Sequence, residues 1–202
     1  MNRGKLIAFE GIDGSGKSTQ LQRLAARLRE TGHSVVTTRE YTDGEVGRKI
    51  RAMARSGERV APQVELQWFM EDRREHVVEV IEPALAAGQI LLTDRYFLSS
   101  VAYQGARGLD WTKILADNEG EFPLPDLALL FSLSADSGMA RIRARKGEVA
   151  QPSFEQLGFQ RQVAAIFAAL TCEYIARIDA DGELDEIEAL TAETVQQRLQ
   201  IA

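Results

Sequence analysis

The strongest chemical signal in the chain is a glycine-rich loop, Gly11-Ile12-Asp13-Gly14-Ser15-Gly16-Lys17-Ser18, followed by Thr19. The loop matches in full the pattern that binds nucleotide phosphates, and it follows a predicted strand and opens a predicted helix, as that pattern requires. Glycines let successive backbone N–H groups turn toward the β-phosphate of ATP, and the helix N-terminus adds its partial positive charge. Lys17 reaches the β- and γ-phosphates, and Ser18 offers its hydroxyl to Mg²⁺. The loop therefore favours an ATP site over a merely structural turn.

A second group of polar residues follows the ends of three predicted strands. Asp13 follows the first, Arg39 and Glu40 the second, and Asp94 and Arg95 the third. Because ligands of an open parallel sheet bind beyond the carboxyl ends of its strands, we expect these side chains to meet in one crevice. We take Asp94 together with Ser18 as candidate Mg²⁺ ligands. The alternative for Asp94 and Arg95 is an ordinary surface pair that closes a strand.

A long predicted helix carries Phe69, Arg73 and His76 at spacings of four and three, and therefore on one face. An aromatic ring one turn from a guanidinium suits a flat heterocycle, because the ring can stack on it and the arginine can donate to a base oxygen. The alternative places Phe69 in the core and extends Arg73 to water. We interpret His76 as a structural hydrogen-bonding residue rather than a catalyst.

Hydroxyl side chains follow the third strand. If the segment is helical, Ser99, Ser100 and Tyr103 lie one turn apart and could read a base edge and a sugar. Capping by the serines and packing by the tyrosine are the alternative.

Three arginines, Arg141, Arg143 and Arg145, alternate at the start of a polar segment over residues 141–153 that contains Gly147 and Pro152. We expect this segment to form a short mobile lid. In a phosphotransferase, guanidiniums that close over the phosphates compensate their negative charge, and the same reason applies to Arg39 and Arg95. A solvated basic edge, or a general preference of the chain for arginine over lysine, is the alternative.

The elements that must position these residues follow from alternating apolar runs and helical patterns. The alternation predicts an α/β fold, a five-stranded parallel β-sheet flanked by helices on both faces. We expect strands over residues 6–10, 34–39, 89–94, 127–133 and 174–179. A helix after the first strand ends near Gly32, a residue suited to a left-handed cap. A longer one covers about 64–87 and ends at Gly88, and helical stretches follow residues 136, 153 and 183.

Composition excludes several classes of protein. A length of 202 residues predicts a single domain over 1–202, and 45% hydrophobic with 27% charged residues is ordinary for a globular chain. Lys+Arg 24 against Asp+Glu 30 leaves a net charge of −6, which disfavours nucleic acid as a partner. With Cys172 as the single cysteine, neither an intrachain disulfide nor a cysteine-rich zinc site can form. We find no signal peptide or membrane span, and we therefore expect a cytoplasmic protein.

Taken together, these residues resemble the thymidylate kinase family of P-loop nucleoside-monophosphate kinases. The resemblance spans most of the chain and rests on residues 9–19, Thr38-Arg39-Glu40, Phe69 with Asp72-Arg73 and His76, Pro83-Ala84-Leu85, Asp94-Arg95-Tyr96, Ser99, Ala102-Tyr103-Gln104-Gly105 and Pro125-Asp126. It implies transfer of the γ-phosphate of ATP to dTMP with Mg²⁺, and commonly a homodimer.

The resemblance also implies roles for individual residues. Phe69 would stack on thymine and Arg73 would bond its carbonyl, with Ser100 and Gln104 near the base and Tyr103 near the deoxyribose, and Ser99 is a further candidate for substrate binding. Arg39 and Arg95 would hold the dTMP phosphate, and Asp13 would lie between the sugar 3′-hydroxyl and the metal-bound phosphates. Gly14 stands where one branch of the family carries an arginine. In the branch with glycine, the lid supplies arginines instead, which Arg141, Arg143 and Arg145 match.

The chain departs from the family pattern at three places. Tyr41-Thr42-Asp43 replaces the usual Pro-Gly-Gly, Pro152-Ser153 precedes Phe154-Glu155 without the usual Asp-Arg, and the loop over residues 104–108 is slightly shortened. Two alternatives therefore stay open: a kinase for another nucleotide or deoxynucleoside, and an inactive nucleotide-binding regulator. A GTPase is disfavoured because the chain lacks an Asn-Lys-x-Asp segment for guanine.

Overall fold

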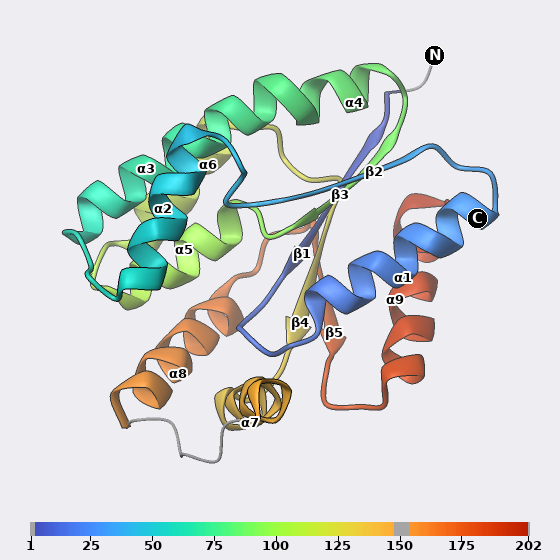
Figure 1. Ribbon diagram of the computed structural model, residues 1–202. Helices are drawn as coiled ribbons and strands as arrows, with labels where there is room; N and C mark the ends of the chain where they lie inside the picture. Colours follow the sequence, from blue (N-terminus) through green and yellow to red (C-terminus); the bar gives the residue numbers. More distant parts are fainter. Residues whose placement is uncertain (1–2, 148–153, 202) are drawn as a thin grey trace.

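A five-stranded parallel sheet lies at the centre of the computed structural model, which describes residues 3–147 and 154–201 (Figure 1). In chain order the strands are β1 (Lys5–Glu10), β2 (Val35–Arg39), β3 (Ile90–Asp94), β4 (Leu127–Ser132) and β5 (Ile175–Asp179). Their order across the sheet is β2-β3-β1-β4-β5. The predicted fold class is confirmed, and each predicted strand agrees with the observed one to within a residue at either end.

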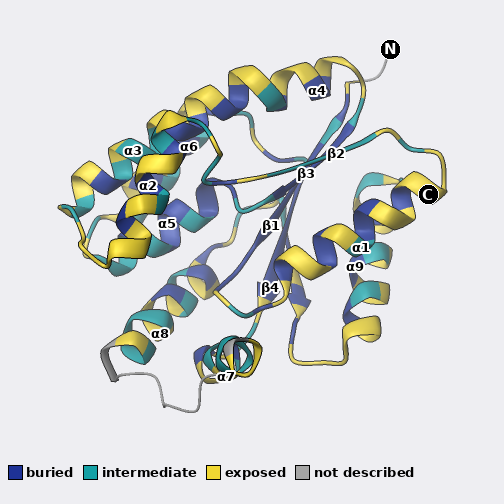
Figure 2. Cartoon of the chain, in the orientation of Figure 1, coloured by how far each residue is buried: buried dark blue, intermediate teal, exposed yellow. Residues whose placement is uncertain are grey.

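Helices cover both faces of the sheet, as predicted. On one face, α1 (Lys17–Glu30) and α9 (Leu184–Leu199) pack on alternate strand residues such as Ile7 and Phe9. On the other face, α5 (Phe97–Ala106) and α8 (Phe154–Ala169) pack on Leu6 and Ala8, together with a long helical rod. Burial is concentrated in the strands and on the helix faces turned toward them (Figure 2). Because β1 and β4 are buried on both faces, their sequences are almost continuously apolar.

The rod consists of α3 (Pro62–His76), a π-helical turn η1 (Val77–Ile81) and α4 (Glu82–Ala86). The sequence predicts one uninterrupted helix here. The structure differs in the π-helical turn, which is wider than an α-helical turn. Pro83 follows the π-turn closely, and it has no N–H to donate to the preceding turn, so the regular α-helical ladder cannot continue through it. Gly88 ends the rod with φ 72°, and Gly32 ends α1 with φ 89°, the conformation expected there.

Two helices were not predicted, α2 (Glu45–Ser56) and α6 (Trp111–Glu121). In α2 the apolar residues Val46, Ile50 and Met53 recur at spacings of four and three, which is a helical pattern that the sequence analysis did not use. The start of α6 is defined by Asp110, whose side chain accepts hydrogen bonds from the backbone N–H groups of Thr112 and Lys113.

The expected lid is partly a helix. α7 (Ala135–Lys146) includes the first part of the segment 141–153, so that part is not a loop. Residues 148–153 lie outside the described residues. In the part of the chain that the structure describes, none of the helices has the length and apolar character needed to cross a bilayer.

Candidate functional site

The glycine-rich loop joins β1 to α1 at the carboxyl edge of the sheet. Gly11 has φ 138°, and a Cβ added there would come within 2.6 Å of the Phe131 carbonyl oxygen, so a larger residue does not fit. Inside the loop, the buried Lys17 ammonium donates to the Ile12 carbonyl oxygen at 2.7 Å and to Ser15 Oγ at 3.3 Å. Burial, followed by the charge of Arg95, lowers the pKa of Lys17 to about 7. The negative charge of a phosphate bound beside Lys17 would raise this pKa again, so the side chain would carry its full positive charge.

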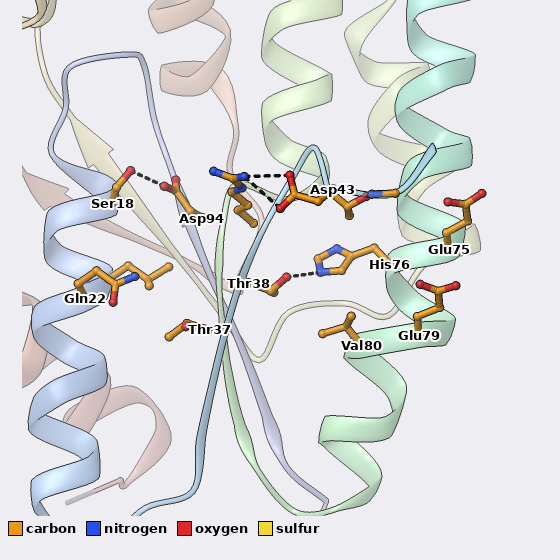
Figure 3. Close-up of a pocket in the computed structure, with 14 residues that line it drawn as sticks. Ser18, Gln22, Thr37, Thr38, Asp43, Glu75, His76, Glu79, Val80 and Asp94 are labelled. Carbon is orange, nitrogen blue, oxygen red and sulfur yellow. Dashed lines mark hydrogen bonds and ion pairs between the residues drawn. The ribbon is translucent and has the colours of Figure 1, made fainter. Parts of the chain in front are cut away.

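Ser18, at the start of α1, donates its hydroxyl to Asp94 Oδ2 at the end of β3 (Figure 3). Mg²⁺ in nucleotide sites takes one or two protein oxygens, with waters and phosphate oxygens completing its shell. The hydroxyl and the carboxylate form such a donor set. Among the described residues there is no group of three or more His, Cys, Asp or Glu that could hold a metal ion, so Mg²⁺ at this place would depend on the phosphates.

A pocket opens beside the loop at the place predicted for ATP, and we call it the nucleotide pocket. It brings together residues from the ends of three strands and from α7 and α8, among them Asp13, Gly14, Gly16, Lys17, Ser18, Thr19, Arg39, Glu40, Asp94, Arg95, Tyr103, Arg141 and Arg145. Gly11 and Ile12 border a neighbouring cavity at the ends of β4 and β5, and Ser15 is buried inside the loop. The pocket thus contains the five residues that follow the first three strands.

A second pocket adjoins the nucleotide pocket at the place predicted for the phosphate acceptor, and we call it the acceptor pocket. Its walls include every residue predicted for the base and sugar, Phe69, Arg73, Ser99, Ser100, Tyr103 and Gln104, together with Arg95, Tyr41, Ile50 and Met53. The Gln104 side-chain oxygen is buried and has no hydrogen-bond partner in the described part of the chain. An acceptor in that position can receive an N–H from a bound heterocycle.

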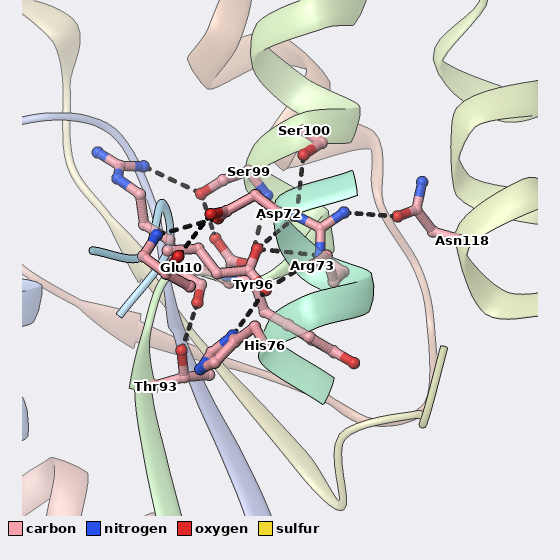
Figure 4. Close-up of polar contacts among 12 residues, drawn as sticks. Glu10, Asp72, Arg73, His76, Thr93, Tyr96, Ser99, Ser100 and Asn118 are labelled. Atoms are coloured by element: carbon pink, nitrogen blue, oxygen red, sulfur yellow. Dashed lines mark hydrogen bonds and ion pairs between the residues drawn. The ribbon is translucent and has the colours of Figure 1, made fainter. Parts of the chain in front are cut away.

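Arg73 forms the centre of a buried network in this pocket (Figure 4). Its guanidinium donates to both carboxylate oxygens of Glu40, with Nη2 at 2.5 Å from Oε2, and also to Asn118 Oδ1 at 2.7 Å and Ser100 Oγ at 3.0 Å. Burial would raise the pKa of Glu40, but the charge of Arg73 and the hydrogen bond with His76 outweigh it and hold that pKa below its usual range. Arg73 is 1% exposed and does not extend to water.

His76 has a supporting position. Its ring nitrogens contact Thr38 Oγ1 at 2.8 Å and Glu40 Oε1 at 3.2 Å, and the ring is buried. It faces a cavity between α1, β2 and α3 that Ser18, Arg39 and Asp94 also border (Figure 3). His76 therefore helps to hold Glu40 against Arg73.

Arg95 lies where the two pockets meet. Its Nη2 is 2.5 Å from Asp13 Oδ1, and its Nη1 is 3.0 Å from Ser99 Oγ. The backbone of Arg95 has φ 74°, which is rare outside glycine. The segment is held by the fully buried Glu10, which accepts from the Tyr96 N–H at 2.8 Å and from the Ser99 hydroxyl at 2.5 Å (Figure 4).

Asp13 keeps its charge at this junction. Desolvation would raise its pKa, but the charges of Arg95 and Lys17 outweigh that effect and hold the pKa below its usual range. A carboxylate beside two cations can order a sugar hydroxyl or a metal-bound water without becoming protonated.

The departure at residues 41–43 changes the surroundings of Arg39. Arg39 Nη2 donates to Asp43 Oδ1 at 3.1 Å, and Arg51 donates to the same oxygen at 2.5 Å. The ring of Tyr41 lies 6.2 Å from that of Phe69, and the Glu40-Tyr41 peptide bond is cis. An aromatic ring thus joins the acceptor pocket, and a carboxylate takes a place beside Arg39.

The three lid arginines separate because their segment is helical. Residues four apart share a face, so Arg141 and Arg145 both border the nucleotide pocket, whereas Arg143 does not line it. Arg141 also donates to the Ala180 carbonyl oxygen at 2.7 Å, after β5. The role predicted for the three guanidiniums toward the phosphates stays a prediction, and in this structure Arg141 and Arg145 are the two that border the pocket.

Sequence reasoning missed several polar residues at the site. Glu10 and Asn118 support Arg95 and Arg73, and Arg59 borders both pockets. Glu40 was expected in the crevice, but not as the partner of Arg73. Glu10 occupies the end of a strand next to a recognised motif, and that position was the signal available. Asn118 and Arg59 lie in segments where the sequence has no motif.

Comparison with known proteins gives one consistent result. The family model described as thymidylate kinase matches residues 9–190. A thymidylate kinase of Desulfotalea psychrophila is 43% identical over 201 residues, covering 100% of this chain and 98% of the relative. One from Xanthomonas campestris pv. campestris (strain B100) is 46% identical over 184 residues, covering 91% and 79%. One from Akkermansia muciniphila is 40% identical over 196 residues, covering 97% and 93%.

Proposed function

The chain belongs to the thymidylate kinase family, and we propose that its two joined pockets divide the reaction of that family between them. The reaction is the transfer of the γ-phosphate of ATP to dTMP, with ATP as co-substrate and Mg²⁺ as metal. The observation that carries the proposal is that Asp13, Arg95 and Tyr103 border both pockets. An acceptor and a donor bound there would meet beside Arg95.

On the donor side, the backbone of the glycine-rich loop and Lys17 bind the β- and γ-phosphates of ATP. Ser18 and Asp94 are the residues that would hold Mg²⁺, which when bound draws negative charge from the phosphate oxygens. Thr19 continues the loop into α1 and also borders the pocket. Arg141 and Arg145 add positive charge from α7.

On the acceptor side, Phe69 stacks on the thymine ring and Arg73 donates to one of its carbonyl oxygens. Ser99, Ser100 and Gln104 belong to the same pocket, where the free Gln104 oxygen suits the ring N–H of thymine. Burial raises the pKa of Tyr103 to about 12, so its hydroxyl stays protonated near the sugar. Its bulk disfavours a 2′-hydroxyl, and Asp13 orders the 3′-hydroxyl.

Arg39 and Arg95 bind the phosphate of dTMP. A phosphate monoester has a second pKa of about 6, so the attacking oxygen is largely deprotonated at neutral pH and no general base is required. Catalysis is then positioning together with charge stabilisation by Lys17 and the arginines around the transferred group.

The test is ADP release from Mg-ATP with purified protein and, separately, dTMP, dUMP, UMP, CMP, dGMP, AMP and thymidine. Turnover mainly with dTMP is expected, because thymine and the deoxyribose each have a recognition group. Equal turnover with UMP would contradict the role given to Tyr103. A Phe69→Leu variant, which keeps an apolar side chain but cannot stack, should raise KM for dTMP and leave KM for ATP unchanged.

We also propose that the chain is a single domain that works as a cytoplasmic homodimer without a nucleic-acid partner. Support for the dimer is a groove between α3 and α6, where Leu66, Met70 and Ile114 lie beside Gln67 and Asp117. Light scattering after size-exclusion chromatography should give twice the chain mass, and Met70→Arg should give the monomer. The net charge of −6 supports the absence of nucleic acid.

A further inference from the structure

Arg59 lies in the segment between α2 and α3, and it borders both pockets. Of these two pockets, Phe69 and Arg73, the proposed base-binding residues, line the acceptor pocket alone, whereas Lys17 and Ser18 line the nucleotide pocket alone. A nucleotide whose base enters the acceptor pocket must therefore place its phosphate near the boundary between the two. The side chain of Arg59 reaches this boundary from a different part of the chain than Arg95 does.

The partners of Arg59 leave a positive charge at that boundary. Arg59 Nη1 lies 2.6 Å from Glu65 Oε1, and Arg107 donates to the other oxygen of the same carboxylate. Glu65 is 1% exposed, while the side chain of Arg59 is 52% exposed. Two guanidiniums thus share one buried carboxylate, and the surplus charge is on the side open to the pockets.

Arg59 can move away from Glu65 without leaving that buried carboxylate unpaired. Arg107 also donates to the Val60 carbonyl oxygen at 2.8 Å, which fixes its position, so Glu65 keeps one charged partner. Burial, and then the charge of Arg59, lower the pKa of Arg107, which means that the two cations repel each other. A phosphate dianion at the boundary would relieve that repulsion.

We infer that Arg59 binds the 5′-phosphate of dTMP as a third guanidinium beside Arg39 and Arg95, and that Glu65 and Arg107 hold it ready at the pocket boundary. The inference rests on the proposed function, because it takes dTMP as the acceptor. Charge-assisted hydrogen bonds between arginine and phosphate are among the strongest in proteins, so loss of this contact is measurable.

The experiment compares dTMP with thymidine, which has the same base and sugar but no phosphate. Calorimetric titration of Arg59→Ala is expected to give a Kd for dTMP about 10-fold higher than that of the wild type, and a Kd for thymidine changed by less than about 2-fold. The matched control is Arg55→Ala, an exposed arginine in the last turn of α2 that lines neither pocket and should change neither Kd.

Each other outcome would overturn the inference. Equal losses for dTMP and thymidine would show that Arg59 only shapes the pocket, and a loss confined to Mg-ATP would assign it to the donor. If the wild type and Arg59→Ala bind dTMP equally well, the role of Arg59 is overturned and the proposed acceptor is not. Failure of the wild-type protein to bind dTMP would overturn the proposed acceptor as well.

Discussion

Glu10→Gln is expected to change how the stability of the protein depends on pH. Glu10 ends β1 beneath the glycine-rich loop and is fully buried. Burial raises its pKa from the ordinary value of 4.5 to about 7, although the hydrogen bond from Ser99 and the charge of Arg95 act in the opposite direction. Between these two values the folded protein therefore binds a proton that the unfolded chain releases.

The sign and the size of the effect follow from this difference. A group whose pKa is raised by folding contributes stability that is complete below its unfolded pKa and is lost as pH rises through its folded pKa. At about 1.4 kcal/mol per pH unit, the interval from 4.5 to about 7 corresponds to about 3 kcal/mol. About 2 kcal/mol of this is lost between pH 5.5 and pH 8.5. Glutamine binds no proton in this pH range, so the Glu10→Gln variant does not lose this part of the free energy of unfolding as the pH rises.

Urea denaturation of both proteins at pH 5.5 and pH 8.5 measures the effect. The free energy of unfolding of the wild type, relative to that of Glu10→Gln, should fall by about 2 kcal/mol from the lower to the higher pH. Glu30→Gln, at an exposed position at the end of α1, serves as the control for the loss of one carboxylate. If the wild type and Glu10→Gln show the same change with pH, the reasoning about buried Glu10 is refuted.

Three further substitutions test the charged groups around the phosphates. Lys17→Met should lower kcat by about 100-fold or more in a protein with unchanged circular dichroism, because a buried charge aimed at the phosphates is lost. Arg95→Ala should lower kcat by a similar factor and change the Kd of Mg-ATP much less; an unchanged kcat would remove Arg95 from the transition state. Asp43→Asn should lower KM for dTMP by about 2-fold at low salt, since Arg39 loses a competing exposed carboxylate, and a higher KM would contradict this.

The middle of the sheet could be predicted because β1, β3 and β4 are buried on both faces. Residues such as those of β1 and β4 have no polar side to interrupt the apolar run, so the run itself marks the strand. The carboxyl ends of β1, β2 and β3 then locate Asp13, Arg39 and Arg95 without any knowledge of side-chain contacts. The glycine-rich loop also shows at which end of β1 the site lies, because its pattern includes the strand before it and the helix after it.

Other parts of the site depend on contacts between residues far apart in the chain. Asn118 lies on α6, 45 positions from Arg73, and no local pattern shows that its amide oxygen reaches the guanidinium. The secondary structure of the lid segment was misjudged for a different reason. Arg141 and Arg145 lie in a run without apolar periodicity, which resembles a loop, yet the helix persists as far as Lys146.

The network around Arg73 fixes its guanidinium independently of the altered residues 41–43. Arginine has five N–H groups, and in the described residues the contacts with Glu40, Ser100 and Asn118 use four of them. The guanidinium is therefore fixed before any base arrives, with one N–H on Nη1 left to donate. Next to it, Asp72 accepts from the Thr42 N–H at 2.9 Å and from the Thr42 hydroxyl at 2.6 Å, which ties the altered turn to α3. The altered segment thus reaches the proposed phosphate end of the pocket through Asp43 and the ring of Phe69 through Tyr41, while the guanidinium of Arg73 keeps its partners.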